Sequence, residues 1–434
     1  MPGHRQKGAA IMDVSYGNVP EGAVWAGIDT HADTNWLSVV DARGRELRSE
    51  QLPATADGCR QAAEIILAMG APVSVGVECT GSYGAGIARE LAGRGIPCYE
   101  VVTPGRPGRG RGCSKDDAAD ALRAALQALS GRDLAVPKAR NGWVEGVRAL
   151  CVVRESLVRA CTSYANLGIA IVREAPDPVR SAFAGLGAAG IMRRCASSGM
   201  PAGCSGVAGA VMLALCRLGE AWLQAKKSAD ELERRIAEMV RAGNPALASM
   251  YGCGPIAAAA LAIAAGDNPE RMHSEAAFAA LCGVSPLRAS SGKTRRHRLS
   301  RGGDRRANRA LHVIAIHRMR TDPRTIAYAE RRRREGLSDR EIRRCLKRYI
   351  AREAYRCLMH PFDLGEASAG PELRYERIAA GVTQKAAASA LGVTASTLCD
   401  LELGHHQFRE LAQRYRRWID DGFPMDPDKG PNGD

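Results

Sequence analysis

Four carboxylates stand where a fold could bring them together. Asp29 ends the apolar stretch VWAGID, Glu78 ends PVSVGVE, and Asp117 and Asp120 lie three residues apart in SKDDAADALRAAL. Closely packed carboxylates repel one another and therefore require a cation. Mg²⁺ prefers oxygen ligands, and two such ions can stabilise the attacking and leaving oxygens of a phosphodiester. The four acids therefore favour metal-dependent chemistry on a phosphodiester.

Each acid alone has a plainer interpretation. An acidic residue at a helix start can cap the helix and suits its dipole, and this is the role we expect for Asp116. Asp33 is interpreted as an incidental neighbour of Asp29, and His31 as a loop residue outside the site. Four acids at compatible places favour the metal site over capping for Asp117 and Asp120.

The elements that must position these acids follow from hydrophobic periodicity. Strands are expected at 24–29, 35–41, 46–52, 72–78 and 96–102, and helices at 57–70, 83–95 and 114–126. The order is β-β-β-α-β-α-β-α, which indicates a mixed sheet with helices on its faces. This is the order of ribonuclease-H-like nuclease domains, here over residues 20–135.

The rest of the chain is predicted to be all-α. Long amphipathic helices at 141–174 and 220–242 indicate a helical spacer over 141–243, which could self-associate as a coiled coil. A basic, mostly helical domain follows over 244–360, and a helix-turn-helix over 371–420. We find no membrane span and no signal peptide. The 14 cysteines form no CxxC pair, which indicates reduced, buried thiols in a cytoplasmic protein.

Positive charge is concentrated in one segment. Residues 288–348 hold 21 Lys and Arg against 6 Asp and Glu, a net charge of +15, whereas the whole chain carries +14. Such an excess points to a polyanion, most simply nucleic acid. The residues expected to contact it here are Lys293, Arg295, Arg296, Arg298, Arg301, Arg305 and Arg306. The loop GRPGRGRG at 105–112 is expected to guide a phosphate backbone past the acids.

Ser290 and Ser291 precede a glycine within this basic field. They could belong to a loop that donates hydrogen bonds to backbone phosphates. Alternatively, one of them could be a nucleophile whose attack on phosphorus is favoured by the nearby cations. Spacing alone leaves both interpretations open.

The segment RIAAGVTQKAAASALGVTASTLCDLELG, residues 377–404, resembles the Cro/repressor class of helix-turn-helix. Thr383 and Thr394 would cap its two helices, and Gly392 would supply the turn. Gln384, Ser396 and Thr397 would then contact DNA. A generic helical hairpin is the alternative, and the segment's role stays open between recognising element ends, repressing a promoter and having lost DNA binding.

Five motifs in order resemble one family over residues 24–358: GIDTH, VGVECTGSYG, SKDDAADA, GCGPIAAAALAIAAGD and GVSPLRASSGKTRRHRLSRGGDRRANRALH. The family is the DEDD-type insertion-sequence transposases, related to the Piv and MooV invertases. The resemblance implies a RuvC-like domain whose acidic tetrad is Asp29, Glu78, Asp117 and Asp120, and a transposase domain whose serine is Ser291, with Ser290 as rival.

The resemblance also implies a mechanism and partners. The tetrad would hold Mg²⁺, expected as two ions, while the serine forms a covalent phosphoserine link to DNA. A bridge RNA would pair with donor and target DNA, and the protein would act as a dimer or tetramer. Two alternatives remain: a RuvC-like junction nuclease without serine chemistry, and a DNA-binding regulator with a relic nuclease site.

Overall fold

The computed structural model describes residues 20–101, 116–197, 206–291, 294–298, 302–362, 370–403 and 408–424. The loop at 105–112, Lys293 and Arg301 lie outside these residues. The chain forms two compact units, each of which we describe by itself. The first unit comprises residues 1–142 and 265–273, and the second comprises 143–264 and 274–434.

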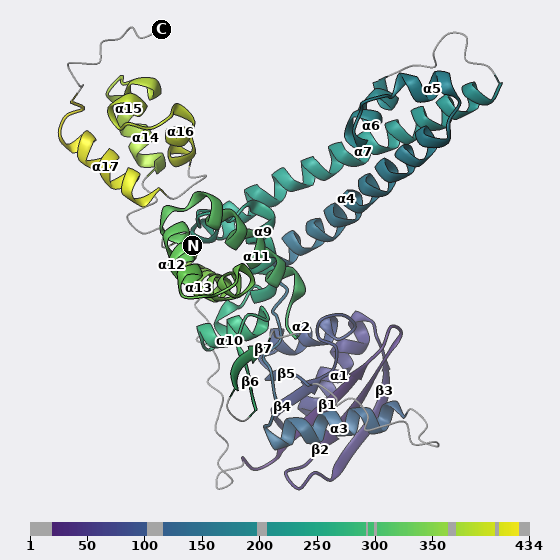
Figure 1. Cartoon of the computed structure of the whole chain (residues 1–434). Coiled ribbons are helices and arrows are strands. Elements are labelled where there is room, and N and C mark those ends of the chain that lie inside the picture. Colours follow the sequence, from purple (N-terminus) through teal and green to yellow (C-terminus); the bar gives the residue numbers. More distant parts are fainter. Residues whose placement is uncertain are drawn as a thin grey trace. The chain divides into compact units, whose positions relative to one another are not determined.

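The first unit is built on a five-stranded mixed sheet in the order β3-β2-β1-β4-β5 (Figure 1). Strand β1 pairs antiparallel with β2 and parallel with β4, so the predicted mixed sheet and its β-β-β-α-β-α-β-α order are confirmed. Its elements are β1 (Ala23–Thr30), β2 (Thr34–Val40), β3 (Glu46–Pro53), α1 (Ala56–Met69), β4 (Ala71–Val77), α2 (Ala85–Gly93), β5 (Cys98–Glu100) and α3 (Asp117–Ser130).

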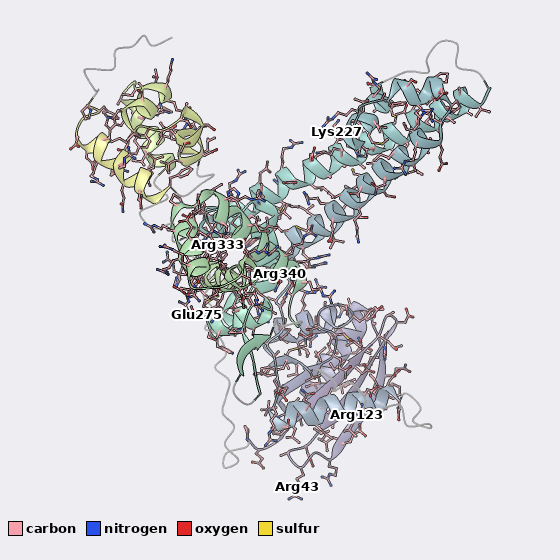
Figure 2. The ribbon with its side chains drawn as sticks, viewed as in Figure 1. Arg43, Arg123, Lys227, Glu275, Arg333 and Arg340 are labelled. Atoms are coloured by element: carbon pink, nitrogen blue, oxygen red, sulfur yellow. The ribbon has the colours of Figure 1, made fainter. Side chains whose placement is uncertain are left out.

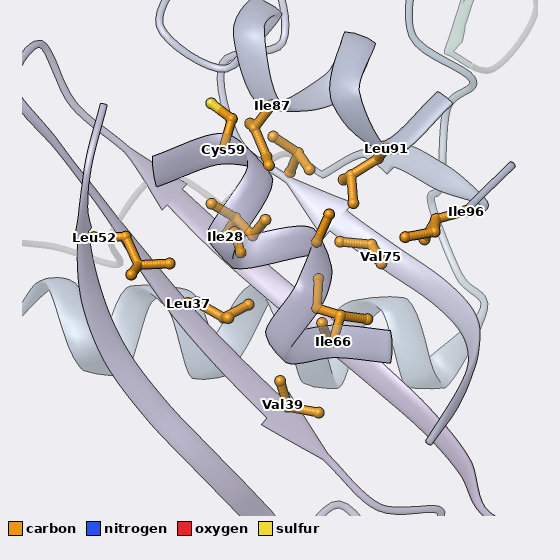
Figure 3. Packing of buried hydrophobic residues seen from close by; sticks show 14 of the residues in the cluster. Ile28, Leu37, Val39, Leu52, Cys59, Ile66, Val75, Ile87, Leu91 and Ile96 are labelled. Carbon is orange, nitrogen blue, oxygen red and sulfur yellow. The ribbon is translucent and has the colours of Figure 1, made fainter. Parts of the chain in front are cut away.

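Alternating residues of β1 divide the core into two layers, because neighbouring side chains of a strand point to opposite faces. Ile28 belongs to the cluster under α1 and α2, which also holds Leu37, Ile66 and Leu91 (Figure 3). Trp25 belongs to the other face, where it packs with Ala125 and Ala128 of α3. Asp29 follows Trp25 at an interval of four, so it lies on the α3 side.

Helix α3 has defined ends. Asp116 accepts a hydrogen bond from the Ala118 N–H, which confirms its expected capping role. Gly131 ends the helix in the left-handed conformation, with φ of 65°. These caps fix Asp117 and Asp120 in the first turn.

The second unit begins with a long helical hairpin of α4 (Trp143–Glu174) and α7 (Gly206–Gly243), which pack side by side (Figure 1). The short helices α5 (Asp177–Ala182) and α6 (Ala188–Ser197) share a core with them that includes Met192, Leu215 and Trp222. Of the described residues, only α7 is long and apolar enough to cross a membrane. This is weak evidence, because a core helix passes the same test.

A helical region with a small hairpin follows. Helix α11 carries buried Leu311 and Ile314, and α13 carries buried Ile342 and Ile350. The elements are α8 (Pro245–Ala248), α9 (Pro255–Ala265), α10 (Glu275–Leu281), β6 (Leu287–Ser291), β7 (Thr294–Arg298), α11 (Arg305–Thr321), α12 (Pro323–Arg334) and α13 (Asp339–Met359). The 3-10 turn η1 (Pro269–Arg271), between α9 and α10 in the chain, belongs to the first unit.

The C-terminal tail has a core of its own, formed by α14 (Gly370–Ala379), α15 (Gln384–Ala390), α16 (Ala395–Glu402) and α17 (Arg409–Asp420). Thr383 and Thr394 cap α15 and α16 as expected, and Gly392 has a φ of 64° in the turn between them. Leu391 and Leu398 are buried. The two helices and the turn expected over 377–404 are therefore present.

Candidate active site

Two glycines let α3 lie directly on the sheet. A Cβ on Gly27 would come within 2.7 Å of the Ala124 carbonyl carbon, and closer still to backbone atoms of Ala121 and Ala125. A Cβ on Gly76 would come within 2.6 Å of the Ala124 carbonyl oxygen. Real Cβ atoms essentially never approach so closely, so both positions require glycine as long as α3 stays in place.

These glycines also determine where the acids meet. Gly27 lies two residues before Asp29, and Gly76 lies two residues before Glu78. Because residues i and i+2 of a strand share a face, α3 lies on the face to which Asp29 points. The first turn of α3 then places Asp117 beside the end of β1.

Three side chains meet at this point. The His31 Nε2 atom lies 3.0 Å from Asp29 Oδ2 and 3.3 Å from Asp117 Oδ1. One ligand atom from each of the three residues lies within 4.8 Å of the other two, a spacing that could hold a metal ion. The Asp29 side chain is 6% exposed, whereas those of His31 and Asp117 are about one-third exposed. The cluster therefore has a buried base and an accessible rim.

Burial raises the pKa of Asp29, and the negative charges of Asp117 and Asp120 raise it further, while His31 opposes them. This is the pattern of carboxylates that compete for one compensating cation. Asp120 forms an ion pair with Arg123 in the next turn of α3, at a position marked in Figure 2.

Glu78 is brought beside Asp29 through the backbone. Its N–H donates to the Ile28 carbonyl oxygen at 3.0 Å, and its own carbonyl accepts from the Thr30 hydroxyl at 3.0 Å. Cys79 follows in the left-handed conformation, with φ of 50°, so the chain turns away from the sheet at once. Glu78 thus directly follows β4, and its backbone lies next to the end of β1.

The Cys79 thiol lies in negatively charged surroundings. Partial burial and the Glu78, Asp29 and Glu100 carboxylates raise the pKa of this thiol. Glu100 ends β5, so a third strand of the sheet also has an acid at or next to its carboxyl end. Cys79 is exposed, and the prediction of buried thiols is therefore wrong at this position. The φ of 50° turns the chain outward there.

His31 was wrongly placed outside the site. It follows Asp29 by two residues, and it bonds to Asp29 just past the end of β1. The i, i+2 relation was a usable signal, because strand alternation extended by two residues places both side chains on one face. The prediction took Thr30 and His31 as loop, which removed that relation.

The donor set fits a divalent cation. Two carboxylate oxygens and an imidazole nitrogen converge, and carboxylates are the ligands that Mg²⁺ and Mn²⁺ share. Asp29 is buried among like charges, which an ion would neutralise. The geometry therefore supports a site for a divalent metal.

The serines lie in the second unit. Strands β6 and β7 form an antiparallel hairpin in which Ser290 pairs with Arg295 and Ser291 pairs with Thr294. The hairpin therefore carries both serines on β6, opposite the strand that contains Arg295, Arg296 and Arg298.

The basic residues that follow begin α11. Arg305 is exposed, while Arg306 forms an ion pair with Glu155 at 2.7 Å. Further along, Arg333 of α12 pairs with Asp339, and Arg340 begins the next helix with it (Figure 2). The basic segment is thus partly neutralised within the protein, and exposed arginines such as Arg305 remain on its surface.

In the tail, the three residues expected to contact DNA differ in their surroundings. Ser396 is exposed at the start of α16. The Thr397 hydroxyl lies 2.8 Å from the Thr394 hydroxyl, and Gln384 donates from Nε2 to Glu402 Oε2 at 2.9 Å. The Gln384 amide therefore already has an internal partner.

Glu402 is the centre of a buried polar cluster. Arg377 donates to both of its oxygens at 2.7 and 2.9 Å, and the Tyr415 hydroxyl donates at 2.8 Å. Burial raises the pKa of Glu402, but the hydrogen bonds from Arg377, Tyr415 and Gln384 outweigh it and hold the pKa below its ordinary value. This cluster ties α14, α16 and α17 together.

Comparison with known families agrees with these two regions. Residues 26–175 match a family model described as a transposase of the DEDD, IS110 type. Residues 244–330 match the model of the transposase IS116/IS110/IS902 family. The two matches together span more than half of the chain, and they cover the acidic cluster and the serine hairpin respectively. No curated protein matches the chain in sequence.

Proposed function

The chain belongs to the IS110 family of DEDD transposases and is a DNA transposase, and we propose that it cuts and rejoins DNA with a tetrad-held Mg²⁺ and a nucleophilic Ser291. The observation that carries the metal part is the convergence of Asp29, His31 and Asp117 at the end of β1. Glu78 and Asp120, which are not among these three converging residues, would complete the acidic set.

Asp29 and Asp117 would hold the metal, with Glu78 and Asp120 as further carboxylate ligands. When bound, Mg²⁺ would neutralise the carboxylates and draw phosphate oxygens to the open rim of the site. The buried Asp29 would be the least mobile of these ligands, because its side chain is only 6% exposed at the end of β1. The more exposed His31 and Asp117 face the substrate side.

Ser291 would attack the phosphorus of one DNA strand. A bond forms between the serine oxygen and phosphorus, and one phosphorus–oxygen bond to a sugar breaks. The serine hydroxyl gives up its proton and the departing sugar oxygen takes one up, so the cut strand leaves with a free hydroxyl and the number of ester bonds is unchanged. The arginines of β7 and Arg305 would stabilise the charge on the phosphate. Ser290 is the adjacent rival for this role.

The basic segment would hold both nucleic acids. Contacts to backbone phosphates give affinity that does not depend on the nucleotide sequence. They would come from Lys293, Arg295, Arg296, Arg298, Arg301, Arg305 and Arg306. A bridge RNA that pairs with donor and target DNA would then determine which sequence is recognised. The tail would add a DNA contact through α16, led by the exposed Ser396. The protein would act in the cytoplasm as a dimer or tetramer.

The test is a covalent adduct. The protein, its co-purified RNA and labelled DNA spanning an element end are incubated with Mg²⁺ and separated on a denaturing protein gel. We expect a labelled adduct that Ser291→Ala abolishes and Ser290→Ala retains. An adduct lost only in Ser290→Ala would reassign the nucleophile.

The alternatives give different results in the same assay. If the wild-type protein cuts the DNA without forming an adduct, and the Asp29→Asn variant does not cut it, the protein is a junction nuclease. Binding with neither cutting nor adduct would identify a regulator. Either outcome would overturn the serine mechanism.

A further inference from the structure

The segment that carries the serine hairpin begins and ends at one point. Asp304 N–H donates to the Leu281 carbonyl oxygen at 2.6 Å, which joins the residues just before and just after the hairpin. A Cβ on Gly303 would come within 2.6 Å of that same oxygen, and a Cβ on Gly283 would come within 2.5 Å of the Gly302 oxygen. The two ends of the segment therefore touch backbone to backbone.

Asn308 of α11 joins this contact. Its Nδ2 donates to the Cys282 carbonyl at 2.8 Å and to the Gly283 carbonyl at 3.1 Å. Asp304 caps the same helix by accepting from Arg306 and Ala307 N–H groups. The start of α11 is thus fixed to both ends of the hairpin segment. We refer to the Asn308 bonds to Cys282 and Gly283 as the hairpin clamp.

Lys347 of α13 sets the direction of the Asn308 amide. Its Nζ donates to Asn308 Oδ1 at 2.8 Å. An ammonium group has donors and no acceptor, so it requires the amide oxygen on its own side. The NH₂ group must then point toward the two carbonyls, and the amide cannot flip without leaving three groups unsatisfied.

Joining α11 to α13 does not by itself explain why a lysine occupies position 347. The residue is 7% exposed. Its burial, and to a lesser extent repulsion from Arg344, lowers the pKa of its ammonium group. Helices α11 and α13 already pack against each other, and both carry buried apolar residues such as Leu311 and Ile350. A buried ammonium opposes folding unless it is well bonded, so its use here is better explained by orienting Asn308.

We propose that Asn308 and Lys347 are positioning residues that fix the base of the β6–β7 hairpin and so determine where Ser291 meets the DNA. The proposal rests on the proposed function for the role of Ser291, but the clamp itself does not. Neither residue touches the reacting atoms. A looser base lets the serine oxygen leave its line of attack, and a misplacement of about 1 Å reduces rate by about 100-fold.

Asn308→Asp separates positioning from folding. Its carboxylate pairs with Lys347 and preserves the contact between α11 and α13, yet it has no N–H group for Cys282 and Gly283. We expect DNA affinity close to that of the wild type, and a fall in Tm of only a few degrees, in line with the loss of these two hydrogen bonds. Hydrogen exchange of the paired amides in β6 and β7 should rise about tenfold, from the loss of roughly 1.4 kcal/mol of hydrogen bonding.

Adduct formation is measured in single turnovers at saturating DNA. We expect the rate to fall about 10- to 100-fold in Asn308→Asp, and less in Lys347→Met, where the amide keeps its donors but loses its orientation. Val313→Ala, on the exposed face of α11, is the matched control and should match the wild type in every measurement.

Three outcomes would overturn the proposal: unchanged hairpin exchange in Asn308→Asp, faster exchange with an unchanged adduct rate, or an adduct rate that falls only in step with Tm. If the wild type forms no serine adduct, the proposed function fails instead. Hydrogen exchange alone then decides whether the clamp holds the hairpin.

Discussion

Replacing Gly27 with alanine tests whether the contact between α3 and the sheet positions the metal ligands. The added Cβ would lie within 2.7 Å of the Ala124 carbonyl carbon, which is about 0.7 Å short of the 3.4 Å where ordinary contact begins. The helix must therefore move away by at least that amount, because the opposing atoms belong to its backbone. Asp117 and Asp120 move with it.

The expected magnitudes follow from that displacement. Overpacking of this kind costs about 1–3 kcal/mol of folding stability, so Tm should fall. Magnesium requires near-ideal octahedral geometry at about 2.0–2.1 Å, so a shift of this size is a third of a bond length. We expect divalent-metal affinity to fall about 10- to 100-fold, in the range measured for disturbed ligand shells.

The assay is calorimetric titration of the metal-free protein with Mn²⁺, together with thermal unfolding. Gly93→Ala is the matched control, since a Cβ there meets nothing within 4 Å, and it should keep metal affinity and Tm. If Gly27→Ala does not fold, Gly76→Ala provides a milder test. Its Cβ would come no closer than 2.6 Å to a backbone atom of α3 and would otherwise meet the movable Val101 side chain, whereas a Cβ on Gly27 would lie closer than that to backbone atoms of both Ala121 and Ala125. A folded variant with wild-type Mn²⁺ affinity would refute the reasoning.

Three further predictions concern charges. Asp29→Asn should raise Tm of the metal-free protein, because it removes a buried carboxylate that Asp117 and Asp120 repel, and should abolish the rise of Tm on adding Mn²⁺; a lower metal-free Tm would contradict this. His31→Gln should weaken the binding of Mn²⁺ more than the binding of Mg²⁺, because it removes a nitrogen ligand. If competitive titrations show the same loss of affinity for both ions, His31 does not ligate the metal directly. Because hydrogen bonding lowers the pKa of Glu402 below 4.5, its contribution to stability should be complete above that pH and be lost as pH falls through the folded-state value. Hydrogen exchange of the tail, measured in the full chain, should become faster as the pH falls through this range. The tail of Glu402→Gln should be less stable near neutral pH by about 3–5 kcal/mol, and its stability should depend less on acid pH.

The sequence was sufficient for the sheet and for part of the site. Apolar alternation predicted β1 and β4, and their terminal acids with the first turn of α3 predicted that Asp29 and Asp117 would meet. His31 was missed because it was taken as a loop residue, although it directly follows β1 and its side chain lies on the same side as that of Asp29. That error is local and could have been avoided.

Other features depend on partners distant in the chain. Gly27 faces the backbone of Ala124, and Asn308 faces Lys347 39 residues away, which no local pattern indicates. Gln384 was predicted to contact DNA from its place at a helix start, whereas its amide bonds to Glu402, 18 residues on. Propensity and spacing predict elements, while such pairings follow from tertiary packing.

The close fit of α3 on Gly27 and Gly76 has a consequence for the inheritance of mobile elements. Every glycine codon is one base from an alanine codon, so a single copying error can separate α3 from the sheet. A copy damaged in this way would keep all four acids, His31 and Ser291. A survey that checks only those residues would class such a copy as active. The two glycines therefore belong in any criterion that separates active from inactive copies of the element.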